Sequence, residues 1–181
     1  NAYAAGYMYS AARYDFGESV STNPVWARGT HNYENVLVVK YDSSGTAVWA
    51  KSVTAGTDAS CFNSITARGT SVYAAGYICG TDEFGLGNSV TASGVNSYKK
   101  ALLVKYETSG SGTTQWAKAV SAAANPSGGY NESCYNSVTT DGSGNVYTAG
   151  YIRNISSYQI SSAVTVDGAY SGNSMVLAKY N

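Results

Sequence analysis

Short runs of β-branched and aromatic residues recur along the chain, and clusters of Gly, Ser, Asn and Asp separate them. Runs of about four to eight such residues between turn formers predict β-strands. No segment keeps the apolar period of about 3.6 residues that a helix requires. We therefore predict an all-β fold, with strands near residues 2–8, 36–41, 47–53, 61–67, 71–78, 101–106, 114–120, 134–140, 145–152 and 175–180.

Four sequence blocks recur in one order, and this repeat organises the chain. The blocks are Ser-Cys-aromatic-Asn-Ser (60–64, 133–137), Tyr-x-Ala-Gly-Tyr (3–7, 73–77, 147–151), an aliphatic run ending in Lys-Tyr (36–41, 101–106, 175–180) and Trp-Ala-Lys (49–51, 116–118). Each block is of strand length, and Gly-containing turns such as Asp42–Gly45 connect several of them. One unit therefore contains four antiparallel strands and about 70 residues, which predicts a long-looped blade of a β-propeller.

The repeat divides one domain, residues 1–181, into units. We expect a partial unit 1–35, repeat units 36–100 and 101–174, and a partial unit 175–181. Long connections lie at 8–35, 79–100 and 153–174; the first carries an insertion near residues 24–28, and the loop 121–130 is longer than its counterpart.

The order and spacing of these motifs resemble a known family. The series Trp-x-Lys, Asn-Ser-Val, Asp-x-x-Gly-Asn-Val-Tyr-x-x-Gly-Tyr, Phe-Gly-x-x-Val-Thr and Val-Lys-Tyr-Asp-x-x-Gly is similar to the bacterial β-propeller repeat called the SBBP repeat, most closely over Asn136–Ile152. The resemblance covers the whole chain, with about two and a half repeats. It implies a propeller fold and a secreted or surface-exposed bacterial protein with no assigned chemistry. The longer unit and the cysteines depart from the family pattern.

The predicted ring of blades is incomplete. The chain opens with the last strand of one unit and stops after the first strand of another, whereas propellers close with at least about four blades. Two explanations stay open: the chain is a fragment of a longer one, which we favour, or it is a protomer whose blades are completed by neighbours.

Charge excludes several classes of partner. The chain has 11 basic and 11 acidic residues and a formal net charge of zero, so we expect no binding to nucleic acid. No apolar run reaches the roughly 20 residues of a membrane helix, and we expect no membrane insertion. Few charges, 17 tyrosines and two prolines fit half-exposed strands of a secreted or cell-surface protein.

The sequence contains no recognisable catalytic apparatus. His31 is the only histidine, Cys-x-x-Cys is absent, and no nucleophile elbow or phosphate-binding glycine loop occurs. We therefore expect no enzyme activity, no cofactor and no metal site. The polar setting Thr30-His-Asn-Tyr33 favours a solvated loop histidine.

The candidate ligand-binding residues are Trp26, His31 and Tyr33, all in the first long connection. Most aromatic residues repeat at strand positions, which favours packing, but the insertion that carries Trp26 has no counterpart. We expect a non-enzymatic binding or scaffold module that presents its long loops to a protein or polysaccharide. The alternative is a structural subunit whose open blade edges assemble as a homo-oligomeric ring or filament.

Three cysteines are an odd number for a secreted chain. If the hairpin turns at Arg68–Ser71, Cys61 lies opposite Ile78 or Cys79, within cross-strand reach. This register predicts a Cys61–Cys79 disulfide and a free, buried Cys134. The alternative is that all three are reduced core residues.

Overall fold

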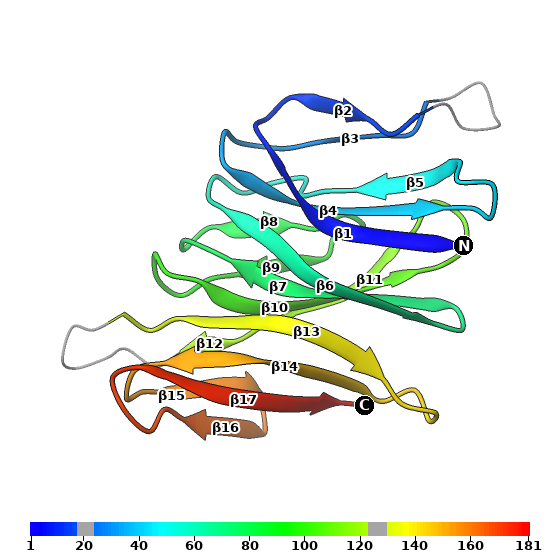
Figure 1. Cartoon of the computed structure of the whole chain (residues 1–181). Helices are drawn as coiled ribbons and strands as arrows, with labels where there is room; N and C mark the ends of the chain where they lie inside the picture. The colour runs from blue at the N-terminus through cyan, green and yellow to red at the C-terminus, as the bar shows by residue number, and fades with distance from the viewer. Residues whose placement is uncertain (18–23, 123–129) are drawn as a thin grey trace.

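The computed structural model describes residues 1–17, 24–122 and 130–181, and it is all-β (Figure 1). All ten strands predicted from the sequence are present. Within the described residues no helix is long and apolar enough to cross a membrane. Residues 18–23 of the first long connection and 123–129 of the loop 121–130 lie outside the described part, so the structure does not report on them.

Three main antiparallel sheets follow one another in chain order, from the blue end of the molecule to the red end in Figure 1. The N-terminal sheet has the order β1-β4-β5, with β1 (Ala2–Tyr9), β4 (Glu34–Tyr41) and β5 (Ala47–Lys51). The central sheet has the order β11-β10-β7-β6, with β6 (Ser60–Arg68), β7 (Ser71–Ile78), β10 (Lys100–Glu107) and β11 (Thr114–Ala119). The C-terminal sheet has the order β13-β14-β17, with β13 (Ser133–Thr140), β14 (Val146–Arg153) and β17 (Asn173–Tyr180).

The long connections contain short strands that the sequence pattern did not predict. They form small sheets: β2 (Arg13–Asp15) with β3 (Trp26–Arg28), β8 (Glu83–Gly85) with β9 (Thr91–Ser93), and β12 (Ser121–Ala122) with β15 (Ser157–Ser161) and β16 (Val164–Asp167). Strands of two to five residues carry too little alternation to be seen in the sequence.

The three main sheets each contain one antiparallel strand pair in which corresponding residues lie opposite each other: β1–β4, β7–β10 and β14–β17. In these pairs a glycine lies opposite an aliphatic residue: Gly6 opposite Leu37, Gly76 opposite Leu102, and Gly150 opposite Val176. These are the glycines and aliphatic residues that recur in the sequence blocks. The Tyr-x-Ala-Gly-Tyr block and the aliphatic block that ends in Lys-Tyr thus occupy corresponding places in the three sheets.

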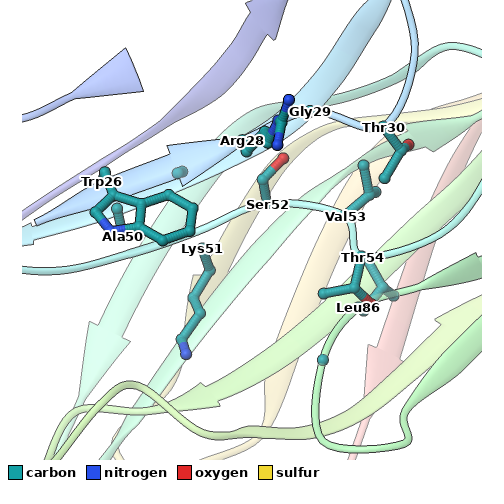
Figure 2. Close-up of a pocket in the computed structure, with 12 residues that line it drawn as sticks. Trp26, Arg28, Gly29, Thr30, Ala50, Lys51, Ser52, Val53, Thr54 and Leu86 are labelled. Carbon is teal, nitrogen blue, oxygen red and sulfur yellow. The ribbon is translucent and has the colours of Figure 1, made fainter. Parts of the chain in front are cut away.

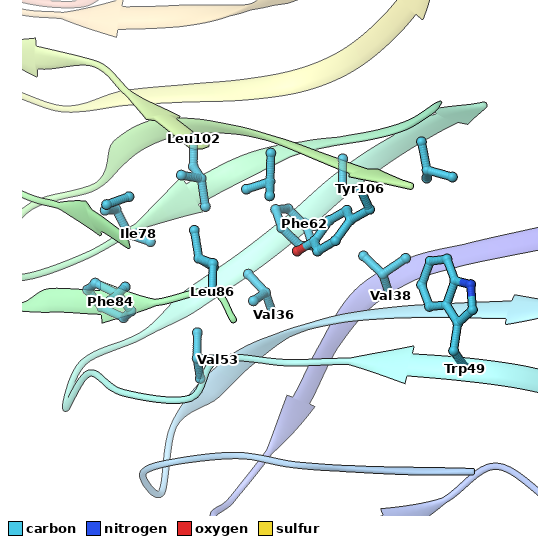
Figure 3. Close-up of a cluster of buried hydrophobic side chains, with 14 residues drawn as sticks. Val36, Val38, Trp49, Val53, Phe62, Ile78, Phe84, Leu86, Leu102 and Tyr106 are labelled. Atoms are coloured by element: carbon cyan, nitrogen blue, oxygen red, sulfur yellow. The ribbon is translucent and has the colours of Figure 1, made fainter. Parts of the chain in front are cut away.

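Apolar side chains fill the space between neighbouring sheets. The cluster between the N-terminal and central sheets contains Val36 and Val38 of β4, Leu102 of β10 and the ring of Phe62, all nearly inaccessible to solvent (Figure 3). Hairpin β8–β9 adds Phe84 to this cluster. A second cluster, between the central and C-terminal sheets, contains Leu103, Tyr135, Ile152, Tyr158 and Val176, among others. Both faces of the central sheet are therefore buried.

A β-bulge marks the same place in β6 and in β13. The register shifts at Asn63 in β6 and at Asn136 in β13. The Asn63 amide leaves its own sheet and donates to Cys134 Sγ at 3.2 Å and to the Tyr135 carbonyl at 2.9 Å. Serine hydroxyls make similar contacts between sheets: Ser60 accepts from Val36 N, Ser133 from Ala101 N, and Ser64 from Val138 N.

The bulge also corrects the cysteine register predicted from sequence. Cys61 lies opposite Tyr77, not opposite Ile78 or Cys79, because Asn63 is an extra residue on β6. The backbone N–H of Cys79 instead donates to the Ala59 carbonyl. The predicted Cys61–Cys79 disulfide is not formed in the structure, where both cysteines and Cys134 are free thiols.

Candidate functional site

Trp26 lies on the short hairpin β2–β3, beyond β5 at the outer edge of the N-terminal sheet (Figure 1). In this hairpin Asp15 pairs with Trp26, and the Arg13 guanidinium lies 4.9 Å from the centre of the indole ring. Arg13 is also ion-paired with Asp15 at 2.7 Å. These contacts orient an indole that is still 48% exposed.

Next to Trp26 is an open pocket with a volume of about 400 Å³, which is within the size range of small-ligand sites. Its walls come from β3, from the end of β5 and the residues after it, and from the loop between β8 and β9. Figure 2 shows Trp26 beside Ala50 and Lys51, and Leu86 at the other end of the wall. The lining residues are Trp26–Thr30, Ala50–Thr54, Leu86 and Gly87.

The pocket wall carries positive charge. Arg28 and Lys51 line it, and the described lining includes no carboxylate. The Lys51 ammonium has no hydrogen-bond or ion-pair partner among the described residues, and burial lowers the pKa of Lys51. A half-buried cation without a partner is unfavourable unless a ligand or water satisfies it.

The hydroxyl of Ser52 adds a second unsatisfied polar group. Its Oγ is buried and has no hydrogen-bond partner in the described part of the chain. Buried hydroxyls are almost always hydrogen-bonded in native proteins. Ser52 follows Lys51 directly, so the pocket offers a cation and a hydroxyl from neighbouring residues, with Trp26 beside them (Figure 2).

The floor of the pocket is rigidly held by hairpin β8–β9. Thr54 N donates to the Gly85 carbonyl at 2.8 Å, and Gly85 N donates to the Ala55 carbonyl at 3.2 Å, which joins this hairpin to the chain after β5. The Leu86 carbonyl accepts from Thr114 Oγ1 at 2.6 Å. A ligand would therefore meet a preformed floor between two sheets.

The structure does not bring His31 and Tyr33 into this pocket, although Thr30 lines it. Their rings pack on each other, with centroids 5.9 Å apart, and Tyr33 is 56% exposed. The interpretation of His31 as a solvated loop residue is wrong in one respect: its Nε2 is buried, without a hydrogen-bond partner in the described residues.

Sequence reasoning missed the buried residue that shapes this loop. Asn35 is fully buried, and its side-chain amide donates to carbonyls that include those of His31 and Tyr33, while its Oδ1 accepts from Thr30 N. Sequence reasoning also missed Lys51 and Ser52 as pocket residues. Lys51 belongs to the Trp-Ala-Lys block and lies near Trp26 only because β3 packs beside β5.

No protein-family model matches the chain, and the search of curated proteins found no significant match. Within the described residues, no group of three or more His, Cys, Asp or Glu side chains could hold a metal ion.

Proposed function

We propose that this chain is part of a β-propeller and acts outside the cell as a binding or scaffold module rather than as an enzyme. Two observations support the propeller: the sheets stack face to face, and the pairs β1–β4, β7–β10 and β14–β17 share one register. On this proposal, units 36–100 and 101–174 are repeats of the SBBP type. The family resemblance and the low content of charged residues favour secretion or a bacterial cell surface.

The ligand that we propose is an acidic polysaccharide bound in the Trp26 pocket. The observation that carries this proposal is the combination of an exposed indole with an unpaired, half-buried Lys51 ammonium in one preformed pocket. An indole face packs well against the apolar face of a sugar ring. A carboxylate on that ring would supply the counter-charge that Lys51 lacks.

Titration of oligogalacturonate into the protein by calorimetry tests the proposal. We expect Trp26→Ala to weaken binding at least about tenfold, which corresponds to about 1.4 kcal/mol. Tyr170→Ala is the matched control, because Tyr170 is 55% exposed in the loop before β17. Absence of binding to acidic and neutral polysaccharides alike would refute the ligand class.

The role of charge has its own matched pair of variants. Lys51→Gln should weaken binding and reduce its dependence on salt concentration, since it removes the counter-charge. Lys118→Gln, the corresponding change in the second Trp-Ala-Lys block, lies on exposed β11 surface and should leave binding unchanged. Equal effects of both changes would contradict a specific role for Lys51.

A second candidate, a self-assembling structural subunit, is favoured by the outer face of β17. Met175 is 95% exposed and Leu177 is 74% exposed. Leu103, which lies opposite Ala75 as Leu177 lies opposite Ala149, is fully buried against the C-terminal sheet. The outer face of β17 therefore matches the face of β10 that the C-terminal sheet covers, and it is apolar enough to be covered by another sheet.

Sedimentation velocity over a range of micromolar concentrations tests this second candidate. Assembly predicts larger species as concentration rises, and Leu177→Arg should abolish them. A monomer at every concentration would contradict assembly and would leave the binding module as the proposal.

A further inference from the structure

Three glycines at corresponding strand positions have different surroundings. A Cβ atom on Gly76 would lie 1.9 Å from the Cys61 carbonyl oxygen, and one on Gly150 would lie 1.9 Å from the Cys134 carbonyl oxygen. Around Gly6, a Cβ atom would meet no atom within 4 Å. The first two positions therefore require glycine, whereas Gly6 faces open space.

The close approach at Gly76 and Gly150 has one cause. Gly76 lies opposite Phe62 of β6, directly beside the bulge at Asn63, and Gly150 lies opposite Tyr135 of β13, directly beside the bulge at Asn136. The bulge places the carbonyl of the cysteine, Cys61 or Cys134, over the glycine, and no side chain fits there. Gly6 pairs with β4 in the same register in which Gly76 pairs with β10 and Gly150 pairs with β17. On its other side, however, Gly6 has no strand that corresponds to β6 or β13, because β1 is the edge of its sheet.

The free edge of β1 has none of the usual protection against pairing. Natural edge strands carry charges, prolines or bulges that prevent another strand from adding to them. Residues 2–9 of β1, Ala-Tyr-Ala-Ala-Gly-Tyr-Met-Tyr, include neither a charged residue nor a proline, and β1 pairs with β4 over all eight residues without a shift. Its outward N–H and C=O groups are available for another strand.

The neighbouring sheet leaves room for such a strand. β6 of the central sheet packs against β1, and in the same way β13 of the C-terminal sheet packs against β7. This packing does not prevent β7 from pairing with a further strand, β6, in its own sheet. The arrangement between the central and C-terminal sheets is therefore a template for a strand added to β1.

We propose that the edge of β1 binds one additional antiparallel strand with the pattern Ser-Cys-aromatic-Asn-Ser-β-branched, the pattern of residues 60–65 and 133–138. Its aromatic residue would lie opposite Gly6, with the bulged asparagine next to it and the carbonyl of the cysteine in the open space over Gly6. That asparagine would donate to Cys61 Sγ and the Phe62 carbonyl, as Asn63 donates to Cys134 Sγ and the Tyr135 carbonyl. The proposal is independent of the polysaccharide site.

A synthetic peptide of residues 59–68, Ala-Ser-Cys-Phe-Asn-Ser-Ile-Thr-Ala-Arg, tests it when added in trans to the full chain under reducing conditions. We expect saturable binding and new hydrogen-exchange protection of backbone amides within residues 2–9. Replacement of the peptide's asparagine by alanine should weaken binding about tenfold, since hydrogen bonds to a buried carbonyl and a sulfur are lost.

Gly6→Ala provides the decisive variant. Its Cβ has open space in the free chain, so the melting temperature should not fall, but the same Cβ would clash with the carbonyl of an added strand. We expect at least about a tenfold loss of peptide affinity. Gly76→Ala is the matched comparison and should destabilise the folded chain, because its Cβ meets the Cys61 carbonyl.

The proposal would be overturned by an absence of peptide binding at high micromolar concentration, by equal binding to the Gly6→Ala chain, or by protection that appears outside β1. Self-association of the wild-type chain that Gly6→Ala abolishes, without any peptide binding, would also overturn it, because the occupant of the edge would then be a second copy.

Discussion

The side-chain amide of Asn63, on the central sheet, donates a hydrogen bond to Sγ of Cys134 on the C-terminal sheet at 3.2 Å. The same amide donates to the Tyr135 carbonyl at 2.9 Å, so one bulged side chain connects two sheets. Asn63→Ala should destabilise the protein by about 1–3 kcal/mol, because it leaves a carbonyl between the sheets without its donor. Urea unfolding measures the change.

Asn136 is the matched control for this prediction. It occupies the corresponding bulge in β13 and is exposed like Asn63, but its Oδ1 accepts only a long contact of 3.6 Å from Cys134 Sγ of its own strand. Asn136→Ala should change the free energy of unfolding by less than about 0.5 kcal/mol. Equal losses in the two variants would show that Asn63 does not connect the sheets as described.

The cysteines should behave as three protected thiols. Burial raises the pKa of Cys61 and of Cys79 to about 11, from 9.0, and also raises the pKa of Cys134. Because the thiolate is the reactive form, a thiol reagent at pH 8 should label the folded chain much more slowly than the unfolded chain. Unfolding without reductant should release three thiols per chain, and a count of one would restore the disulfide predicted from sequence.

The ionisation of Asp141 should make the stability of the fold depend on pH. Hydrogen bonds from the Asn145 side chain and backbone, from Tyr147 and from Ser143 lower the pKa of Asp141 to about 2, from 3.8. Because the folded pKa lies below the unfolded one, this stabilisation is complete above pH 3.8 and is lost as pH falls from 3.8 toward 2.

Unfolding by urea at pH 5 and at pH 2.5 tests this dependence. Asp141→Asn should lower the free energy of unfolding at pH 5. It should therefore also reduce the difference between the free energies of unfolding at pH 5 and at pH 2.5. Glu83→Gln is the control, because the Glu83 side chain is exposed and has no hydrogen bond in the described residues. An unchanged pH dependence in Asp141→Asn would contradict the role of this turn.

Leu103 and Leu177 test the packing of the sheets. Leu103 is fully buried, and Leu103→Ala should destabilise the chain by about 2–5 kcal/mol. Leu177 is 74% exposed, and Leu177→Ala should change stability by less than about 0.5 kcal/mol in a dilute solution of monomer. Thermal unfolding of both variants at low protein concentration measures the contrast. A large loss in Leu177→Ala alone would contradict the order of the sheets.

The long strands could be predicted from sequence, and the bulges could not. Runs such as Val36–Val39 and Ala101–Val104 are β-branched or aliphatic, lie between turn residues, and form β4 and β10. Asn63 looks like any strand residue in the sequence, because a bulge depends on the fit between β6 and Gly76. That one extra residue moved Cys61 to a position opposite Tyr77 and made the predicted cysteine register wrong.

The candidate site was predictable only in part. Trp26 could be singled out because its insertion is absent from the other repeats, and the structure places it at a pocket. Lys51 and Ser52 could not be assigned to the site, since residues 26 and 51 come together through the packing of β3 beside β5. Leu86 reaches the same pocket from the next sheet's hairpin, which no local pattern encodes.

Fluorescence of Trp26 during titration with an acidic sugar tests the proposed binding function most directly. Trp26 is 48% exposed and lines the pocket, whereas Trp49 is 4% exposed and Trp116 of β11 lies outside the pocket lining, so a bound sugar ring should alter mainly the emission of Trp26. We predict saturable quenching by oligogalacturonate, little response to the same oligosaccharide after reduction of its carboxyl groups, and no response in Trp26→Ala. Equal quenching by both oligosaccharides, or none by either, would contradict an acidic-polysaccharide site at this pocket.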